Sequence, residues 1–387
     1  MKRVLIFSLA YYPHVGGAEV ALKEITDRLT DIEFHMVTMR FSGTEAREEK
    51  VGNIFVHRIG NGEGRLNKYL YQFFAAWKGA QLHRQYHFGA LWAMMAHSSG
   101  VPAALFKLFH PRVPYVLTLQ EGDPPEYIER LAWPVWPLFS RAFTSADAIA
   151  AESTFLGRWA LRRGFKGPLE VIPNGMDAER FARVPAQGET EAVRAKIGKK
   201  EGEIWLVHTG RLVHKNALDI CIRALPLLPE TVRFFMLGDG PDKNMLVKLG
   251  RELGVSARTH FHPYVPLVEI PNYLKACDLF IRPSRSEGMG NSFIEAMAAG
   301  LPVIATQEGG IADFLFDAKR NPDKPTTGWA VDKDSPEQIA EAVKDILAHP
   351  EEVARVVATA KKLALENYDW DTIAKDMREK VFMRVLG

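Results

Sequence analysis

The chain has 387 residues, 47% of them apolar, and a formal net charge of only +2. Because single hydrophobic cores rarely serve more than about 250–300 residues, this length predicts two domains. The small net charge offers no extended basic surface for nucleic acid, and the sequence contains neither an eighteen-residue apolar run nor a signal peptide, so we expect a cytoplasmic protein. The cysteines, Cys221 and Cys277, lie in apolar segments without metal-ligand spacing, which predicts that both belong to a core.

Strand patterns alternate with helical patterns through the first 170 residues. Apolar runs predict buried strands at 4–10, 33–39, 54–58, 90–95, 115–119 and 148–151. Such alternation is typical of a doubly wound parallel sheet. His97 and Gln120 each follow one of these runs, and ligands bind at the carboxyl edge of parallel sheets, so we expect both residues to line a cleft.

Two glycine turns frame this first region. Gly16 and Gly17 follow the first predicted strand and precede an amphipathic helix. A glycine pair at a helix start either brings backbone amides close to an anion or is a plain turn. The Pro-Asn-Gly segment at 173–175, after a short strand, predicts a second turn.

The stretch from Gly64 to Gln120 contains no Asp or Glu. Its basic residues are Arg65, Lys68, Lys78, Arg84, Lys107 and Arg112. Residues 66–86 predict a helix with large apolar residues at spacings of three and four, namely Leu66, Tyr69, Leu70, Phe73, Phe74 and Trp77. This face either packs on the sheet or lies on an anionic membrane surface, to which nearby basic residues add attraction.

A second series of strands begins at 204–209, after a surface connection predicted for 185–202. Arg211 and Lys215 leave the end of that first strand together. Loop cations are often merely solvated, but a guanidinium can hold phosphate through two hydrogen bonds and an ammonium adds a compact charge. No Gly-x-Gly-x-x-Gly follows a strand, which argues against a dinucleotide-dependent dehydrogenase.

Residues 282–306, RPSRSEGMGNSFIEAMAAGLPVIAT, are the most informative stretch. A strand at 277–281, a glycine-rich loop at 283–290, a helix at 291–299 and a strand at 302–306 predict a βαβ unit whose loop amides suit an anion. Glu287 and Glu295 flank this loop, and carboxylates accept hydroxyl groups rather than phosphate. Glu295 alternatively closes a capping box with Ser292. A phosphate cradle beside hydroxyl acceptors indicates a sugar nucleotide.

Glu287, seven intervening residues and Glu295, set in Ser-Glu-Gly-Met-Gly-Asn-Ser-Phe-Ile-Glu, resemble the signature of the retaining glycosyltransferases of GT-B fold. That family includes bacterial mannosyl- and glucosyltransferases, sucrose synthases and glycogen synthases. The resemblance implies two Rossmann-like domains facing across a cleft. Residues 1–172 would bind the acceptor, 173–369 the nucleotide sugar, and a last helix at about 370–387 would cross back onto the first domain.

The same resemblance implies the reaction and its partners. The donor would be a UDP- or GDP-linked sugar, the acceptor a glycan or a lipid-linked glycan, and no cofactor would be needed. Glu287 would contact the transferred sugar and Glu295 the ribose. Arg211 and Lys215, within Gly-Arg-Leu-x-x-Lys, would hold the diphosphate. Other donor contacts are implied for Gly16, Gly17, Val265, Gly288, Met289, Gly290, Asn291 and Ser292.

One position departs from the family pattern. Many relatives have a histidine in Thr-x-His beside the transferred sugar, whereas residues 118–120 end in Gln120. An amide cannot act as a general base, so Gln120 is expected to position the donor sugar. Asp-x-Asp at 332–334 and 369–371 is not assigned to a metal, because Arg211 and Lys215 already supply positive charge. A non-hydrolysing sugar-nucleotide epimerase and an inactive sugar-nucleotide-binding protein remain as alternatives.

Overall fold

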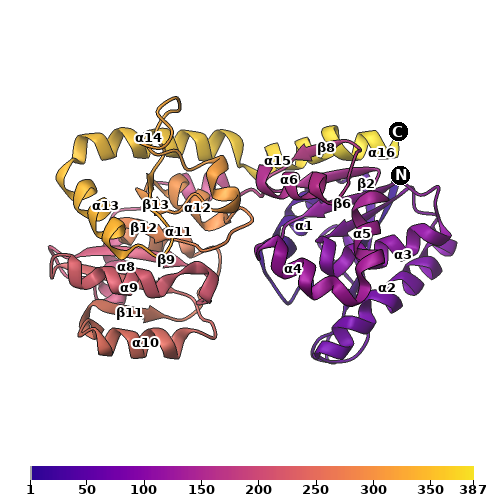
Figure 1. Cartoon of the computed structure of the whole chain (residues 1–387), viewed down its shortest axis with the longest axis horizontal. Coiled ribbons are helices and arrows are strands. Elements are labelled where there is room, and N and C mark those ends of the chain that lie inside the picture. Colours follow the sequence, from indigo (N-terminus) through magenta and orange to yellow (C-terminus); the bar gives the residue numbers. More distant parts are fainter. Residues whose placement is uncertain (1) are drawn as a thin grey trace. The chain divides into compact units, whose positions relative to one another are not determined.

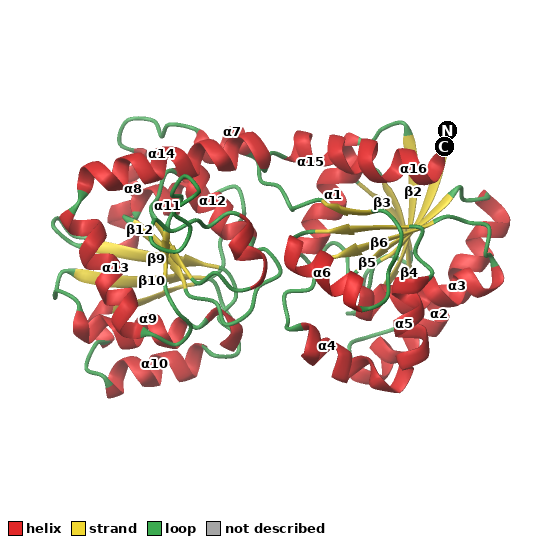
Figure 2. Cartoon of the chain, turned by 45° about the horizontal axis from the view of Figure 1, so that its top comes forward, coloured by secondary structure: helices red, strands yellow, loops and turns green. Residues whose placement is uncertain are grey.

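The structure is a computed structural model that describes residues 2–387, and it separates into two compact units (Figure 1). Unit 1 contains the residues up to Gly175 together with Trp370–Gly387, and unit 2 is Met176–Asp369. Each unit has one sheet with helices on both faces (Figure 2). The prediction of two doubly wound, largely parallel α/β domains is confirmed.

The sheet of unit 1 has eight strands in the order β3-β4-β2-β1-β5-β6-β7-β8, parallel except for the β3–β4 hairpin. The strands are β1 (Lys2–Phe7), β2 (Ile32–Met39), β3 (Glu48–Val51), β4 (Ile54–Ile59), β5 (Ala90–Met94), β6 (Tyr115–Leu119), β7 (Ala148–Ala151) and β8 (Leu169–Val171). Every predicted apolar run of this region forms a strand. The sequence did not predict β3, because Glu-Glu-Lys-Val at an exposed edge has no apolar pattern.

The helices of unit 1 pack on both faces of its sheet. They are α1 (Gly17–Arg28), α2 (Arg65–Tyr86), the π-helical turn η1 (Ala96–Gly100), α3 (Val101–Phe109), α4 (Pro125–Ala132), η2 (Trp133–Val135), α5 (Trp136–Thr144) and α6 (Thr154–Arg162). Successive residues of β1 alternate between two cores, as a strand requires: Leu5 and Phe7 join one, Val4 and Ile6 the other.

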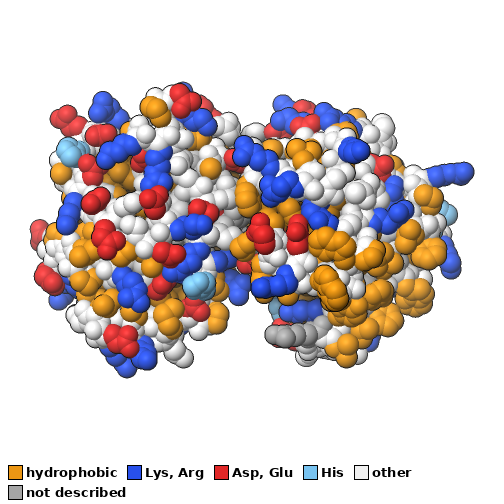
Figure 3. Space-filling view, viewed as in Figure 1, with side chains coloured by type: hydrophobic (Ala, Val, Ile, Leu, Met, Phe, Trp, Pro, Cys, Tyr) orange, Lys and Arg blue, Asp and Glu red, His pale blue; other side chains and the backbone are white. Residues whose placement is uncertain are grey.

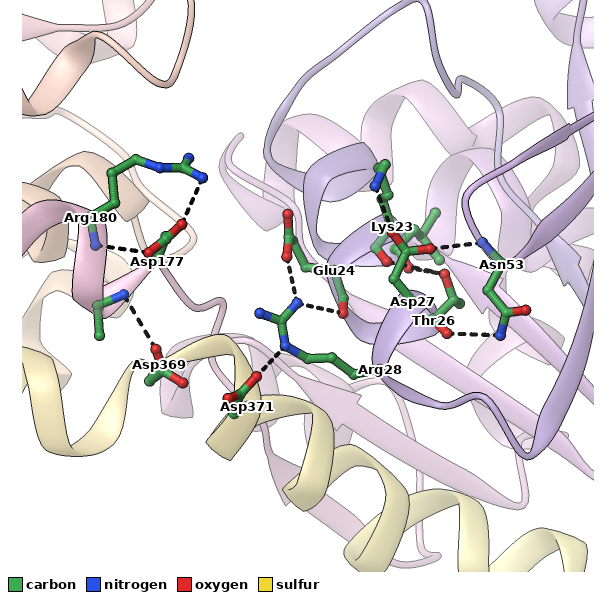
Figure 4. A network of polar contacts seen from close by, with 12 residues as sticks. Lys23, Glu24, Thr26, Asp27, Arg28, Asn53, Asp177, Arg180, Asp369 and Asp371 are labelled. Carbon is green, nitrogen blue, oxygen red and sulfur yellow. Dashed lines mark hydrogen bonds and ion pairs between the residues drawn. The ribbon is translucent and has the colours of Figure 1, made fainter.

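The C-terminal segment completes unit 1. It consists of α15 (Trp370–Asp376), the π-helical turn η7 (Met377–Phe382) and α16 (Met383–Leu386). Trp370 and Phe382 enter the core that α1 covers. Arg28 of α1 donates hydrogen bonds of 2.5 Å to Asp371 and to Glu24, which attaches α15 to α1 (Figure 4).

Unit 2 has a six-stranded parallel sheet in the order β11-β10-β9-β12-β13-β14. Its strands are β9 (Ile204–Thr209), β10 (Val232–Leu237), β11 (Thr259–His262), β12 (Leu279–Arg282), β13 (Val303–Ala305) and β14 (Trp329–Ala330). Its helices are α7 (Ala178–Ala182), α8 (Glu189–Ile197), η3 (His214–Asn216), α9 (Leu218–Ala224), η4 (Leu225–Leu227), α10 (Lys243–Glu252), η5 (Ser256–Arg258), α11 (Ile270–Ala276), α12 (Asn291–Ala299), η6 (Gly309–Asp313), α13 (Pro336–Ala348) and α14 (Pro350–Asn367).

The surface connection predicted at 185–202 contains a helix that the sequence did not predict, α8. This helix has no fully buried residue, so it lacks the apolar stripe that predicts a helix. Over residues 2–387, no helix is both long enough and apolar enough to cross a membrane.

Candidate functional site

The glycine-rich loop of unit 2 joins β12 to α12 at the carboxyl edge of the sheet. Gly290 is the residue before the helix, with φ +92°, and α12 begins at Asn291. Ser292 therefore lies inside the first turn, and among the described residues its Oγ has no hydrogen-bond partner. The capping-box alternative for Ser292 and Glu295 is wrong, since no side chain caps this helix. The first amides of α12 carry the partial positive charge that suits a phosphate.

The backbone of this loop is held by neighbouring glycines. Gly309 has φ +60°, and any Cβ on it would overlap the carbonyl of Glu287. The amide of Gly310 donates to that same carbonyl at 3.2 Å. Thr306 Oγ1 donates to the carbonyl of Ser284 at 2.7 Å. The turn after β13 therefore fixes the position of the glutamate in the loop.

The two predicted cations follow β9 in a second loop. Arg211 is exposed and Lys215 is half-buried. Asn216 closes the loop from below, because its Nδ2 donates to the carbonyl of Arg211 at 2.7 Å. The left-handed residue of this loop is Ala217, with φ +55°, so Asn216 holds the loop through its side chain rather than through a left-handed backbone conformation.

Arg285 joins the two loops, a role that the sequence did not predict. Its backbone amide donates to the carbonyl of Lys215 at 2.7 Å. Its guanidinium donates to both carboxylate oxygens of Asp219, at 3.0 and 2.8 Å, and to the carbonyl of His214 at 2.7 Å. An arginine in a loop gives no signal in a single sequence that it is bound in this way. Arg211, Lys215 and the α12 amides thus belong to one connected sheet edge.

Glu287 is held by a second arginine that the sequence analysis also missed. Its side chain is 11% exposed, and Nη2 of Arg282 donates to it at 3.0 Å. Ser284 Oγ lies 3.4 Å from the same carboxylate oxygen. The guanidinium of Arg282 also stacks over the ring of Phe293, at 4.2 Å from the ring centroid. Arg282 and Ser284 consequently orient the carboxylate of Glu287.

Glu295 lies in the middle of α12 and is half-buried. Desolvation by burial raises the pKa of its carboxyl group from 4.5 to about 7, and the positive charge of Arg282 opposes this rise. The group therefore titrates near neutral pH. An ionised carboxylate accepts hydrogen bonds from hydroxyl groups, and its protonated form accepts fewer.

The remaining predicted donor contacts of unit 2 are backbone positions. Met289 and Val265 are buried, with 2% and 6% of their surface exposed, and both belong to the hydrophobic core. Their side chains therefore serve packing. Gly288 is buried, whereas Asn291 and Ser292 are half-buried at the start of α12.

Unit 1 places a polar cluster at the carboxyl edge of its own sheet. Gln120 is buried, and its Nε2 donates to Asn174 at 2.7 Å, while Asn174 donates to Glu152 at 3.0 Å. The Oε1 atom of Gln120 has no partner in the described chain. Glu121, next along the chain, accepts from the amide of Ala96 at 2.5 Å.

His97 lies in the same cluster of unit 1, with its Nδ1 3.7 Å from the carboxylate of Glu121. His97 belongs to η1. The residue directly before η1, Met95, has φ +69°. At the start of α1, the amide of Gly16 donates to the carboxylate of Glu19 at 2.7 Å. A Cβ at Gly17 would meet nothing within 4 Å, so the surface there is open.

Two family models match the chain in consecutive parts. The model of Glycosyltransferase Family 4 matches residues 15–180, and that of Glycosyl transferases group 1 matches residues 189–363. Together they cover most of both units.

Similar proteins include glycosyltransferases that act on inositol-containing acceptors. The GDP-mannose-dependent alpha-(1-6)-phosphatidylinositol monomannoside mannosyltransferase of Mycolicibacterium smegmatis is 31% identical over 258 residues, or 62% of this chain and 65% of that protein. The D-inositol 3-phosphate glycosyltransferase of Rhodococcus jostii is 30% identical over 284 residues, or 70% of this chain and 59% of that protein. The chain thus matches slightly less than two thirds of the length of each relative.

Solved structures match the whole chain. HepE from Anabaena in complex with UDP and glucose gives a TM-score of 0.79 at 20% identity, covering 99% of this chain and 100% of that one. Sucrose-phosphate synthase from Thermosynechococcus elongatus gives 0.84 at 17% identity, covering 100% and 99%. At these identities the likeness establishes the fold.

Proposed function

This chain belongs to the glycosyltransferases of the GT-B fold, and from that premise we propose that it transfers a sugar from a nucleoside diphosphate to an acceptor hydroxyl group, with retention at the anomeric carbon. The observation that carries the proposal is the connected edge of unit 2. There Arg285 joins the loop of Arg211 and Lys215 to the loop that ends at the first amides of α12. Phosphate suits this edge, and the two glutamates beside it suit sugar hydroxyl groups.

The proposed chemistry is electrostatic stabilisation of the leaving group. Arg211, Lys215 and the amides near Gly290 neutralise the charge that develops on the departing diphosphate, without a metal ion. Glu287 contacts the transferred sugar, and Glu295 binds the ribose. In unit 1, Gln120 is assigned to a sugar hydroxyl group through its unpartnered Oε1, because its Nε2 already donates to Asn174. Gln120 itself supplies no base.

The donor is proposed to be a UDP- or GDP-linked hexose. The relative from Mycolicibacterium smegmatis is named for GDP-mannose, and HepE was solved with UDP and glucose. Incubation with a panel of UDP- and GDP-linked sugars tests this assignment, with transfer, hydrolysis and epimerisation scored separately and the product anomer read by NMR. Epimerisation without transfer would favour the epimerase alternative. Nucleotide binding without turnover would favour the inactive binding protein.

The acceptor is proposed to be a lipid-linked glycan at an anionic membrane surface, in glycolipid or polysaccharide synthesis, and α2 carries this proposal. The buried stripe of α2 consists of Tyr71, Ala75, Gly79 and Leu82. The opposite face exposes Leu66, Tyr69, Leu70, Phe73, Phe74 and Trp77. The alternative that this second face packs on the sheet is therefore wrong. A helix that buries one apolar face in the core and exposes a second one to water indicates a binding surface, because large exposed apolar patches mark protein or membrane contacts.

The exposed apolar surface extends beyond α2. Phe74 and Trp77 are 54% and 62% exposed, and Phe109 at the end of α3 is 80% exposed. Figure 3 shows hydrophobic side chains gathered over the part of unit 1 where Figure 1 places α2 and α3. Arg84 lies seven residues after Trp77, hence on the same side of the helix. The side chain of Arg65 lies outside the part of the chain that the structure describes.

Positive charge beside this face favours anionic lipid over a second protein. A cavity of about 530 Å³ next to Trp77 is lined by Arg47, Arg58 and Lys78. Glu48 also lines it, 3.6 Å from Lys78, and Glu49 pairs with Arg58 at 2.5 Å. An exposed basic residue near an anionic leaflet adds about 1 kcal/mol of attraction, whereas Arg58, which is buried and paired with Glu49, adds little. Aromatic side chains such as Trp77 bind at the lipid headgroup level.

Liposome flotation tests the membrane proposal. We expect the wild type to float with anionic vesicles at low salt, and Lys68→Glu with Lys78→Glu to reduce flotation. Trp77→Ser should also reduce it at unchanged melting temperature, because the side chain is exposed. Lys166→Glu is the control, because Lys166 is an exposed residue that precedes β8, and β8 lies at the other end of the sheet from the β3–β4 hairpin. Flotation that is absent in the wild type, or unchanged by the charge reversals, would refute the proposal.

A further inference from the structure

Arg282 lies beneath the candidate site of unit 2, in a position that the proposed transfer does not explain. It ends β12, and its side chain is 8% exposed. A Cβ built on Gly290 would lie 2.6 Å from Nη2 of Arg282, and one built on Gly210 would lie 3.6 Å from Nη1. The guanidinium therefore touches both loops that carry the candidate phosphate-binding groups.

The charges around Arg282 are mainly negative. Nη2 donates to Glu287 at 3.0 Å, and the negative charges of Glu287 and Glu295 both oppose the lowering of the pKa of Arg282 by burial. His208 of β9 also faces the guanidinium, but burial and the charge of Arg282 keep the pKa of His208 well below 6.5, so its ring is neutral. The Nε atom of Arg282 has no partner among residues 2–387.

Fold stability alone does not account for an arginine here. The three preceding residues of β12, Leu279, Phe280 and Ile281, are apolar and buried. An apolar fourth residue would continue the strand without the cost of desolvating a charge, and replacing buried ion pairs by apolar residues is often neutral or stabilising. Because fold stability does not explain a buried charge whose Nε has no partner among the described residues, we look for the role of Arg282 in its interaction with the carboxylates of Glu287 and Glu295.

Building on the proposed glycosyl transfer, we propose that Arg282 is the positioning residue of this site. Its guanidinium orients the Glu287 carboxylate toward the transferred sugar and supplies a buried positive charge that favours the ionised form of Glu295 beside a bound diphosphate. Without that charge, two carboxylates and a diphosphate would share one poorly solvated edge, and Glu295 would keep its proton. Arg282 acts through the glutamates and needs no contact with the substrate.

The first test measures Glu295 directly and needs no donor. The full chain is labelled with ¹³C at the glutamate side-chain carboxyl carbons, and the Glu295 signal is identified by its loss in Glu295→Gln. In Arg282→Met we expect the Glu295 titration to move to higher pH by ~1 pH unit or more, as expected when a carboxylate loses an adjacent cation. In Arg282→Lys, which keeps the charge, it should stay near the wild-type position. An unmoved titration in Arg282→Met would overturn the electrostatic part.

The second test separates orientation from binding. Because Arg282→Lys keeps the charge but loses the planar fork, we expect turnover to fall about 10–100-fold, the scale of a small misplacement, while the affinity for UDP or GDP stays within about twofold. Wild-type turnover in Arg282→Lys, with a wild-type circular dichroism spectrum, would overturn the orienting part. This variant also decides the case if Arg282→Met does not fold. A wild type that binds no nucleotide would instead remove the proposed function and leave the titration result standing.

Discussion

Replacement of Glu295 by glutamine should stabilise the protein at high pH while it weakens nucleotide binding. The folded-state pKa of Glu295 is about 7, whereas an ordinary glutamate has 4.5. Between those values the folded state holds the proton more tightly than the unfolded state, so the free energy of unfolding falls as pH rises. At 1.36 kcal/mol per pH unit, the gap corresponds to about 3 kcal/mol. The cost is absent below pH 4.5 and complete above about pH 7.

Urea denaturation of the wild type and of Glu295→Gln, at pH 4.5 and at pH 8, measures this cost. The unfolding free energy of the variant relative to the wild type should rise by up to about 3 kcal/mol between the two pH values, because glutamine does not titrate. Glu191→Gln, at an exposed position of α8, is the matched control and should follow the wild type at both pH values. Parallel behaviour of Glu295→Gln and the wild type would refute the reasoning.

The same variant links stability to binding. If the ionised carboxylate accepts the ribose hydroxyl groups, the affinity of the wild type for free UDP or GDP should increase as pH rises through about 7. Glu295→Gln should bind more weakly at pH 8 and lose this increase. Calorimetry at pH 6 and pH 8 measures both effects. A site residue that costs stability in its working form is what a functional role predicts.

Three further predictions address the remaining site residues. Arg211→Ala and Lys215→Ala should each lower the rate of transfer by roughly 10²–10³-fold, with Arg251→Ala, at an exposed position, as the control. Near-normal rates in both variants would contradict the assignment of Arg211 and Lys215 to the diphosphate. A chelator should leave the wild-type rate unchanged, and activity that is lost on chelation and restored by a divalent metal would contradict metal-independent transfer. Glu287→Gln should lower turnover far more than the affinity for free nucleoside diphosphate, and equal losses by calorimetry would contradict its assignment to the sugar.

The sequence predicted the secondary-structure elements of the candidate site of unit 2 where local patterns determine them. The helix at 291–299 matches α12, because a glycine-rich loop and a following apolar turn mark a helix start without reference to the rest of the chain. The strand predicted at 277–281 is observed as β12, Leu279–Arg282. The difference of one residue at its end is important, because it includes Arg282, which the sequence pattern placed in neither the strand nor the loop.

Interactions between segments distant in the sequence could not be predicted in the same way. Arg285 contacts Asp219, and Gly309 backs Glu287, yet each pair is separated by more than twenty residues and by at least one complete element. The apolar periodicity of α2 likewise predicted a helix at 66–86 but not which face is buried. Both faces are apolar, and the small residues Ala75 and Gly79, which the pattern ignores, form the buried one because they allow close packing on the sheet.

The two arginines that the sequence missed explain why this edge can exist before any ligand binds. In the proposed site, Arg211, Lys215 and the helix amides repel one another when no diphosphate is bound, and the two glutamates are repelled by the diphosphate when it is bound. Arg285 is neutralised by Asp219 and holds the cation loop against the glycine loop in either state. The positive charge of Arg282 compensates the negative charges of Glu287 and Glu295. Arg285 and Arg282 therefore reduce the electrostatic repulsion both in the empty and in the occupied site. A site that consisted only of residues contacting the substrate would lack this compensation.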